Sequence, residues 1–173
     1  MSAPTIETAR VRLRAHELQD FRDSAALWAD PIVTRHIGGQ PLSQEDSWSR
    51  LLRYAGHWHL LGFGYWLAED KVTGAFLGEL GFADYKRDLQ PSLNGIPEAG
   101  WVFAPSAHGK GYATESLQAI LEWGKRNLAS SRTTCLIAPE NSASIRVAEK
   151  CGYQEGVRTT YKGKPTTIFF RDR

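Results

Sequence analysis

The stretch His108-Gly-Lys-Gly-Tyr-Ala-Thr114 lies between a predicted strand over residues 98–104 and a predicted helix. Two glycines without side chains allow a backbone to come close to a phosphate group. The unpaired N–H groups and the dipole of a helix start then favour an anion at the same place. The stretch is therefore a candidate pyrophosphate site, although a Gly-x-Gly alone is more typical of an ordinary tight turn.

Two common phosphate motifs do not fit these residues. A P-loop requires Gly-Lys followed by Ser or Thr, and here Lys110 precedes Gly111. A dinucleotide fingerprint requires a third glycine three residues after the second, and Thr114 occupies that place. The turn therefore holds a different phosphate-bearing group, or none.

The pattern of apolar residues on either side predicts one mixed α/β sheet. Helical spacing indicates helices over 17–29, where Pro31 ends the helix, and over 43–59, where Ser43 and Asp46 resemble a capping box. The polar segment 84–97 is expected to be a loop. The expected strands cover 5–14, 64–69, 74–83, 98–104, 135–138, 153–160 and 166–171, and two further helices follow Gly111 and Ser142. This order predicts a single layer of strands with helices on both faces.

The composition is that of an ordinary globular domain. The chain has 173 residues with a formal charge of +2, which is too small for a general nucleic-acid binder. No apolar run reaches the roughly 20 residues that span a bilayer, and the first residues lack a signal-peptide pattern. Cys135 and Cys151 are expected to be small core residues with reduced thiols. We therefore expect a cytoplasmic protein without a membrane or nucleic-acid partner, and the histidine spacing predicts no metal site.

Four blocks of the sequence resemble the GCN5-related N-acetyltransferases (GNAT), especially their ribosomal-protein alanine N-acetyltransferase-like branch. That family's loop has Gln or Arg, two residues, Gly, one residue, then Gly or Ala; Gly111 and Ala113 match, whereas His108 replaces Gln or Arg. The other similar blocks are Ile6–Arg14, Glu98–Pro105 and Pro139–Tyr153. The resemblance implies one domain over residues 1–173, with a mixed sheet of about six to seven strands and helices on both faces. It also implies transfer of an acetyl group from acetyl-CoA to a primary amine, on a protein N-terminus or a small molecule, by direct attack in a ternary complex.

The resemblance also suggests which residues hold acetyl-CoA in a protein expected to act as a monomer or homodimer. Backbone groups of Val102 and Phe103 would bind the pantetheine arm and the thioester oxygen, and Asn141 would bind the pantetheine region. Asn141 at this junction is equally a helix N-cap. The pyrophosphate would be held by the loop residues His108, Gly109, Lys110, Gly111, Tyr112, Ala113 and Thr114.

Acetyl transfer also requires a group that receives the amine proton and a donor for the departing thiolate. Glu98 is the first candidate for the base or amine anchor, because it shares a strand face with Gly100 and Val102, and Glu79 is its rival. Many GNAT proteins have a tyrosine where this chain has Ala148, so Ser144 is the candidate thiolate donor, or a first-turn serine satisfied by the backbone. Two other interpretations are an acetyl-CoA-binding module without turnover and a nucleotide-binding α/β domain.

Overall fold

The computed structural model describes residues 2–173 as one eight-stranded mixed sheet in the order β1-β2-β3-β4-β5-β6-β8-β7. All neighbouring strands are antiparallel except β5 and β6, which are parallel. The strands are β1 (Ile6–Glu7), β2 (Val11–Arg14), β3 (Tyr65–Asp70), β4 (Phe76–Ala83), β5 (Glu98–Phe103), β6 (Arg132–Ile137), β7 (Gln154–Tyr161) and β8 (Lys164–Asp172).

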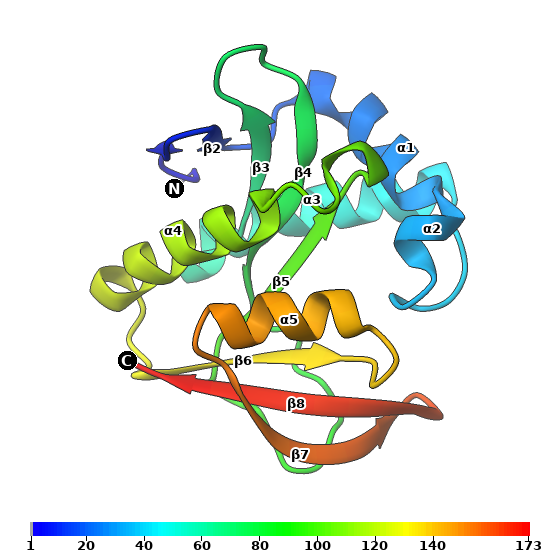
Figure 1. Cartoon of the computed structure of the whole chain (residues 1–173), viewed down its shortest axis with the longest axis vertical. Helices are drawn as coiled ribbons and strands as arrows, with labels where there is room; N and C mark the ends of the chain where they lie inside the picture. The colour runs from blue at the N-terminus through cyan, green and yellow to red at the C-terminus, as the bar shows by residue number, and fades with distance from the viewer. Residues whose placement is uncertain (1) are drawn as a thin grey trace.

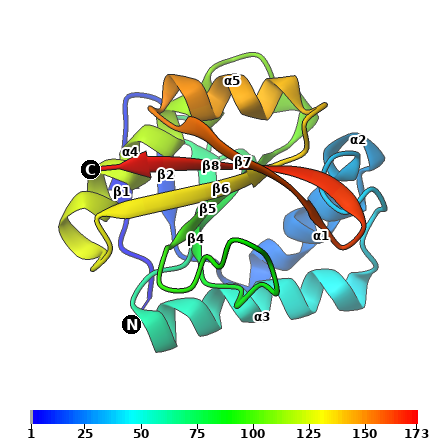
Figure 2. The ribbon, with the colours of Figure 1, turned by 90° about the horizontal axis from the view of Figure 1, so that it is seen from below.

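Helices cover both faces of this sheet, as predicted. In Figure 2, α4 and α5 lie above the sheet and α1 and α3 below it. None of the helices in residues 2–173 is both long and apolar enough to cross a bilayer. The α-helices are α1 (Phe21–Ala29), α2 (Pro31–Thr34), α3 (Gln44–Leu61), α4 (Tyr112–Asn127) and α5 (Ser142–Lys150), and the 3-10 turns are η1 (Leu18–Asp20) and η2 (Pro105–Ala107).

The sheet has more strands than the six to seven predicted, because the segment 5–14 is not one strand. It folds back on itself as β1 and β2, with Ile6 opposite Leu13. The turn is closed by Thr8, whose N–H donates to the carbonyl oxygen of Val11 at 2.9 Å. The weak alternation of this segment therefore reflects a short hairpin at the sheet edge.

Pro31 ends α1 as predicted, and it has a second role that the sequence did not indicate. It is also the first residue of α2, where the missing N–H costs nothing and the fixed φ suits a helix. The carboxylate of Asp30 caps this turn by accepting a hydrogen bond from the Ile32 N–H at 2.8 Å. At α3 the predicted cap is confirmed, because the Ser43 hydroxyl accepts from the Asp46 N–H at 3.0 Å.

The main core lies between the sheet and α4. Leu117 and Ile120 of α4 are fully buried, and burying such a side chain stabilises a protein by about 1.5–3 kcal/mol. Gly124 lets Phe82 approach the helix, since a Cβ there would lie 3.3 Å from the ring. Cys135 and Cys151 are buried in the same core, which confirms their predicted packing role.

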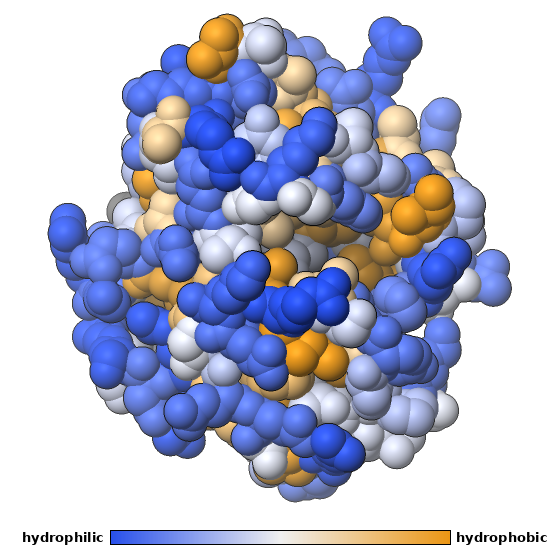
Figure 3. Space-filling view, in the orientation of Figure 1, coloured by the Kyte–Doolittle hydropathy of each residue, from blue (hydrophilic) through white to orange (hydrophobic). Residues whose placement is uncertain are grey.

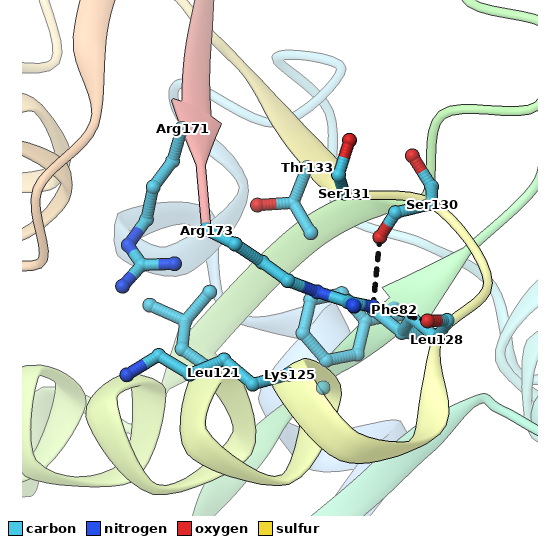
Figure 4. Close-up of a pocket in the computed structure, with 10 residues that line it drawn as sticks. Phe82, Leu121, Lys125, Leu128, Ser130, Ser131, Thr133, Arg171 and Arg173 are labelled. Atoms are coloured by element: carbon cyan, nitrogen blue, oxygen red, sulfur yellow. Dashed lines mark hydrogen bonds between the residues drawn. The ribbon is translucent and has the colours of Figure 1, made fainter.

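The C-terminus closes a small pocket at the end of α4. Figure 4 shows Arg173 reaching across this pocket from the end of β8. Its guanidinium donates to the carbonyl oxygens of Leu128 and Ser130. A cation beside the carbonyls at a helix C-terminus is favourable, so this pocket is a structural anchor of the chain end.

Candidate active site

The sheet is open between its two parallel strands. β5 and β6 are paired at one register position, Glu98 opposite Thr134, where the Thr134 N–H donates to the Pro97 carbonyl at 3.0 Å. Beyond this position the strands diverge, so that in Figure 1 β5 points upward while β6 runs to the right beneath α5. We call the region between the two diverging strand backbones the gap; it widens toward the C-terminal end of β5.

The backbone of β5 presents Trp101 and Phe103, not Val102, to this gap. The Pro97 carbonyl points toward β6, where it accepts from Thr134. The Ala104 N–H points toward β4, where it donates to the Leu77 carbonyl at 2.8 Å. Backbone groups alternate along a strand, so Val102 faces β4 with Ala104. The prediction that backbone groups of Val102 face a ligand is therefore wrong, whereas the same prediction for Phe103 fits the geometry.

The glycine loop follows β5 at the open end of the gap. Gly109 and Gly111 have φ of 72° and 82°, a left-handed conformation that favours glycine. α4 begins at Tyr112 without a side-chain cap. The first N–H bonded inside the helix belongs to Glu115, which donates to the Gly111 carbonyl at 3.0 Å. The N–H groups of residues 112–114 have no helical partner, and they suit an anion such as a pyrophosphate.

One side chain and one backbone carbonyl of the loop hold it in place. His108 Nε2 lies 2.8 Å from the carbonyl oxygen of Phe103, so the imidazole joins the loop to the end of β5. Lys110 is exposed, and its carbonyl accepts a hydrogen bond from Arg10 Nη1 at 2.9 Å. The side chain that replaces Gln or Arg in the family pattern thus supports the loop through β5.

Sequence reasoning missed an ion pair that fastens this loop to the edge of the sheet. Arg10, in the turn between β1 and β2, lies 2.7 Å from the carboxylate of Glu115 on α4. Thr8 also donates to that carboxylate, at 2.6 Å. Partial burial would raise the pKa of Glu115, but these hydrogen bonds from Thr8 and Arg10 lower it. Because Arg10 and Glu115 are 105 residues apart, no local pattern could have revealed the contact.

α5 begins on the other side of the gap, directly after β6. The Asn141 carboxamide oxygen accepts from the Ser144 N–H at 3.2 Å, which confirms Asn141 as an N-cap. Ser144 is half-buried, and Ala148, on the same helix face, is fully buried in the core. A tyrosine would not fit at position 148 without displacing its neighbours.

Glu98 lies at the closed end of the gap in an ion pair. Arg87 holds both of its carboxylate oxygens, with N–O distances of 2.6 and 2.7 Å. The pair is mostly shielded from solvent, at 22% and 12% exposure of the two side chains. Such a bidentate contact fixes the carboxylate strongly, and no pattern in the sequence indicated this partner.

Glu79 lies on the same face of the sheet but is completely buried beneath α1 and α3. It accepts hydrogen bonds from Trp28 Nε1 at 2.9 Å and from the Tyr54 hydroxyl at 3.0 Å, and His16 Nε2 lies 3.3 Å away. Burial alone would raise the pKa of Glu79, but the contacts with His16, Ser24 and Trp28 bring it below its usual value. The lowered pKa favours the ionised carboxylate, whose Oε2 accepts both hydrogen bonds while Oε1 has the contact with His16.

The face that carries the gap is hollowed. Figure 3, in the orientation of Figure 1, shows the hollow right of centre, between α2 and α5, with apolar side chains at its floor. Within residues 2–173, no three histidine, cysteine, aspartate or glutamate side chains gather as metal ligands do. The site therefore consists of an open strand edge, a helix start suited to an anion, and the carboxylate of Glu98.

Comparison with known proteins gives a consistent answer. An acetyltransferase (GNAT) domain model matches residues 10–154. An uncharacterized protein, YkkB of Bacillus subtilis (strain 168), is 34% identical, with 99% of this chain and 98% of that protein covered. A putative GNAT-family acetyltransferase from Bordetella pertussis has a TM-score of 0.85 at 28% identity, covering 98% of this chain and 99% of that one.

A more distant neighbour agrees in fold. The ribosomal L7/L12 α-N-protein acetyltransferase RimL, solved in complex with coenzyme A, has a TM-score of 0.78 at 18% identity, with 98% of both chains covered. The sequence match over most of the chain and the shared architecture show that this protein belongs to the GNAT acetyltransferase family.

Proposed function

We propose that this protein is an acetyl-CoA-dependent N-acetyltransferase that acts on a primary amine by direct attack in a ternary complex. The observation that carries the proposal is that two sets of unpaired backbone groups lie close together. The free edge of β5 and the uncapped start of α4 lie at the same end of the gap. An elongated ligand with a pyrophosphate at one end and a hydrogen-bonding arm suits this arrangement.

The residues divide between the two parts of acetyl-CoA. The N–H groups from Gly109 to Thr114 would hold the pyrophosphate, with His108 and Lys110 shaping the loop. The backbone of Phe103 would bind the arm and the thioester oxygen. The Asn141 amide nitrogen would bind from the other side, since its oxygen already caps α5.

The transfer forms a C–N bond and breaks the C–S bond. The neutral amine nitrogen attacks the thioester carbon, its surplus proton passes to a carboxylate, and coenzyme A leaves as a thiolate that takes up a proton. We assign Glu98 as the acceptor of the amine proton, directly or through water, because it lies at the gap whereas Glu79 is enclosed. Arg87 would then fix the direction in which the Glu98 carboxylate points.

Ser144 is the group we assign to the departing thiolate. A serine hydroxyl is a weak acid, so its role is a hydrogen bond to the developing charge and not full proton transfer. Its half-buried position in the first turn of α5, across the gap from β5, is consistent with that role. A cytoplasmic location, favoured by two unpaired cysteines, is part of the same proposal.

Two measurements test the proposed function together. Acetyl-CoA should raise the thermal unfolding midpoint, whereas NAD and ATP should not, because a ligand at 100 times its Kd stabilises the folded state by about 2.7 kcal/mol. Release of free thiol from acetyl-CoA should then require an added amine. Stabilisation without thiol release for any amine would instead identify a binding module, and stabilisation by ATP or NAD alone would identify a nucleotide-binding domain.

A further inference from the structure

The side of the gap covered by α1 and α3 carries a cation, Arg50, that is not paired with a carboxylate in residues 2–173. The guanidinium carbon of Arg50, on α3, lies 3.8 Å from the centroid of the Trp28 ring. Nε of Arg50 is buried and has no hydrogen-bond partner, and no carboxylate in residues 2–173 pairs with this side chain. Leaving a partly buried charge uncompensated is costly, so the position suits an anion that arrives with a ligand.

Tyrosine hydroxyls connect this guanidinium with the middle of β5. Arg50 lies among Tyr54, Tyr65 and Tyr85. The hydroxyl oxygens of Tyr65 and Tyr85 are 3.4 Å apart, and a Cβ at Gly100 would lie only 2.1 Å from that of Tyr65. Gly100 is half-exposed although it belongs to a central strand. The partly exposed backbone of Gly100 is therefore in contact with phenol groups, and Arg50 lies next to them.

The other charged side chains around Gly100 and Tyr85 are mostly positive or already paired. Arg53 and Arg87 lie over the Tyr85 ring, at 5.4 and 4.7 Å from its centroid. The Glu98 carboxylate is paired with Arg87, and the buried Glu79 carboxylate accepts hydrogen bonds from Trp28 and Tyr54. A polycationic acceptor would meet repulsion here, whereas an acceptor with a negative group would be attracted.

We infer that the acceptor is a small primary amine that also carries a carboxylate, and that Arg50 receives this carboxylate. The inference rests on the proposed function and specifies its substrate class. The planar fork of a guanidinium matches the two oxygens of a carboxylate, and stacking on Trp28 fixes the plane of that fork. With its carboxylate on α3, such a molecule directs its amine toward Gly100 and the gap.

Matched acceptors test the inference on the intact protein. Each of a set of amino acids is compared with its own primary amide, which keeps the amine and removes the negative charge, and with spermine as a polycation. We expect kcat/KM for the amino acids to exceed that for the amides by about tenfold to a hundredfold, the value of a charge-assisted contact. Equal or better use of the amides or of spermine would overturn the inference and leave the proposed function intact.

Variants of Arg50 add a second measurement. Arg50→Gln should raise KM for the amino acids until the preference over amides disappears, while acetyl-CoA affinity is unchanged. Arg50→Lys should keep part of the preference, because the charge remains without the fork. Arg126→Gln, at the exposed end of α4, is the matched control and should behave as the native protein. A preference that survives in Arg50→Gln contradicts the inference.

The outcomes separate the two proposals. No thiol release with any amine would contradict the proposed function and the substrate class with it. Thiol release without a carboxylate preference would contradict the substrate class alone. If Arg50→Gln does not fold, the comparison of amino acids with their amides in the native protein still decides the question.

Discussion

At the scale of single residues, Glu98 combines two tasks. Its backbone lies at the single position where β5 is paired with β6, and its carboxylate is held by Arg87. Glu98→Gln keeps the size of the side chain and removes the base. We expect acetyl-CoA affinity to be unchanged and kcat at neutral pH to fall by about a hundredfold or more, with partial recovery as pH rises and the amine deprotonates unaided.

Glu79→Gln is the comparison that decides between the two carboxylates. If steady-state kinetics show the pH-dependent loss in Glu79→Gln and not in Glu98→Gln, the assignment moves to the buried carboxylate. The structure favours Glu98 because Glu79 has no exposed surface.

A second prediction concerns Ser144. Ser144→Ala should retain acetyl-CoA affinity and lower kcat on the order of a hundredfold, because one positioned donor to the developing charge is lost. The loss should shrink with an acyl donor whose thiol is more acidic, since that leaving group needs less stabilisation. Native turnover of Ser144→Ala with acetyl-CoA would show that the serine only begins the helix.

The third prediction concerns stability and follows from Glu79. Burial opposes ionisation of Glu79, but its contacts with His16, Ser24 and Trp28 lower its pKa below the ordinary value. The ionised carboxylate therefore contributes stability that is present above the unfolded pKa and is lost as pH falls through the folded pKa. Glu79→Gln should therefore lower the free energy of unfolding at pH 7 by about 1–3 kcal/mol, the cost of an unsatisfied buried group. Urea unfolding at pH 7 and at pH 4 measures this, and a difference that grows toward acid would contradict the assignment.

At the scale of elements, the loop between β5 and α4 depends on its backbone conformation. Gly111 has a φ of 82°, which a β-branched residue adopts only under strain. Gly111→Val should therefore abolish acetyl-CoA binding, as measured by calorimetry, whereas circular dichroism should show that the variant is still folded. Gly163→Val is a useful control, because Gly163 has a similar φ of 75° in the exposed β7–β8 turn. Unchanged coenzyme A affinity in Gly111→Val would remove the central claim about the loop.

Most helices and strands could be predicted from the sequence, because each depends on residues that are close together in the chain. Ser43 caps α3 through the Asp46 N–H, and Gly152 ends α5 with a φ of 85°, both as their residue types predict. The exceptions are short. The hairpin of β1 and β2 is too brief for a clear alternation, and Pro31 can end one helix and begin the next.

At the scale of the whole molecule, the contacts that assemble the site join residues that are far apart in the chain. Arg10 meets Glu115, Trp28 meets Glu79, and Arg50 stacks on Trp28. None of these pairs leaves a local signal, so the sequence indicated the loop and the candidate carboxylates but not their partners. The orientation of Val102 likewise depends on which edge of β5 faces β4, and this follows from the register of the sheet.

The single pairing between β5 and β6 has a further consequence for how the molecule holds together. Strands β1–β5 and strands β6–β8 form two half-sheets that share one rung of the backbone ladder. In an ordinary sheet the hydrogen bonds between two neighbouring strands continue along their length. Here β5 and β6 leave their facing edges unpaired, and the amide groups of the proposed ligand would pair with those edges. Acetyl-CoA would then act as a temporary strand that bridges the two half-sheets beyond the one pairing that already joins them.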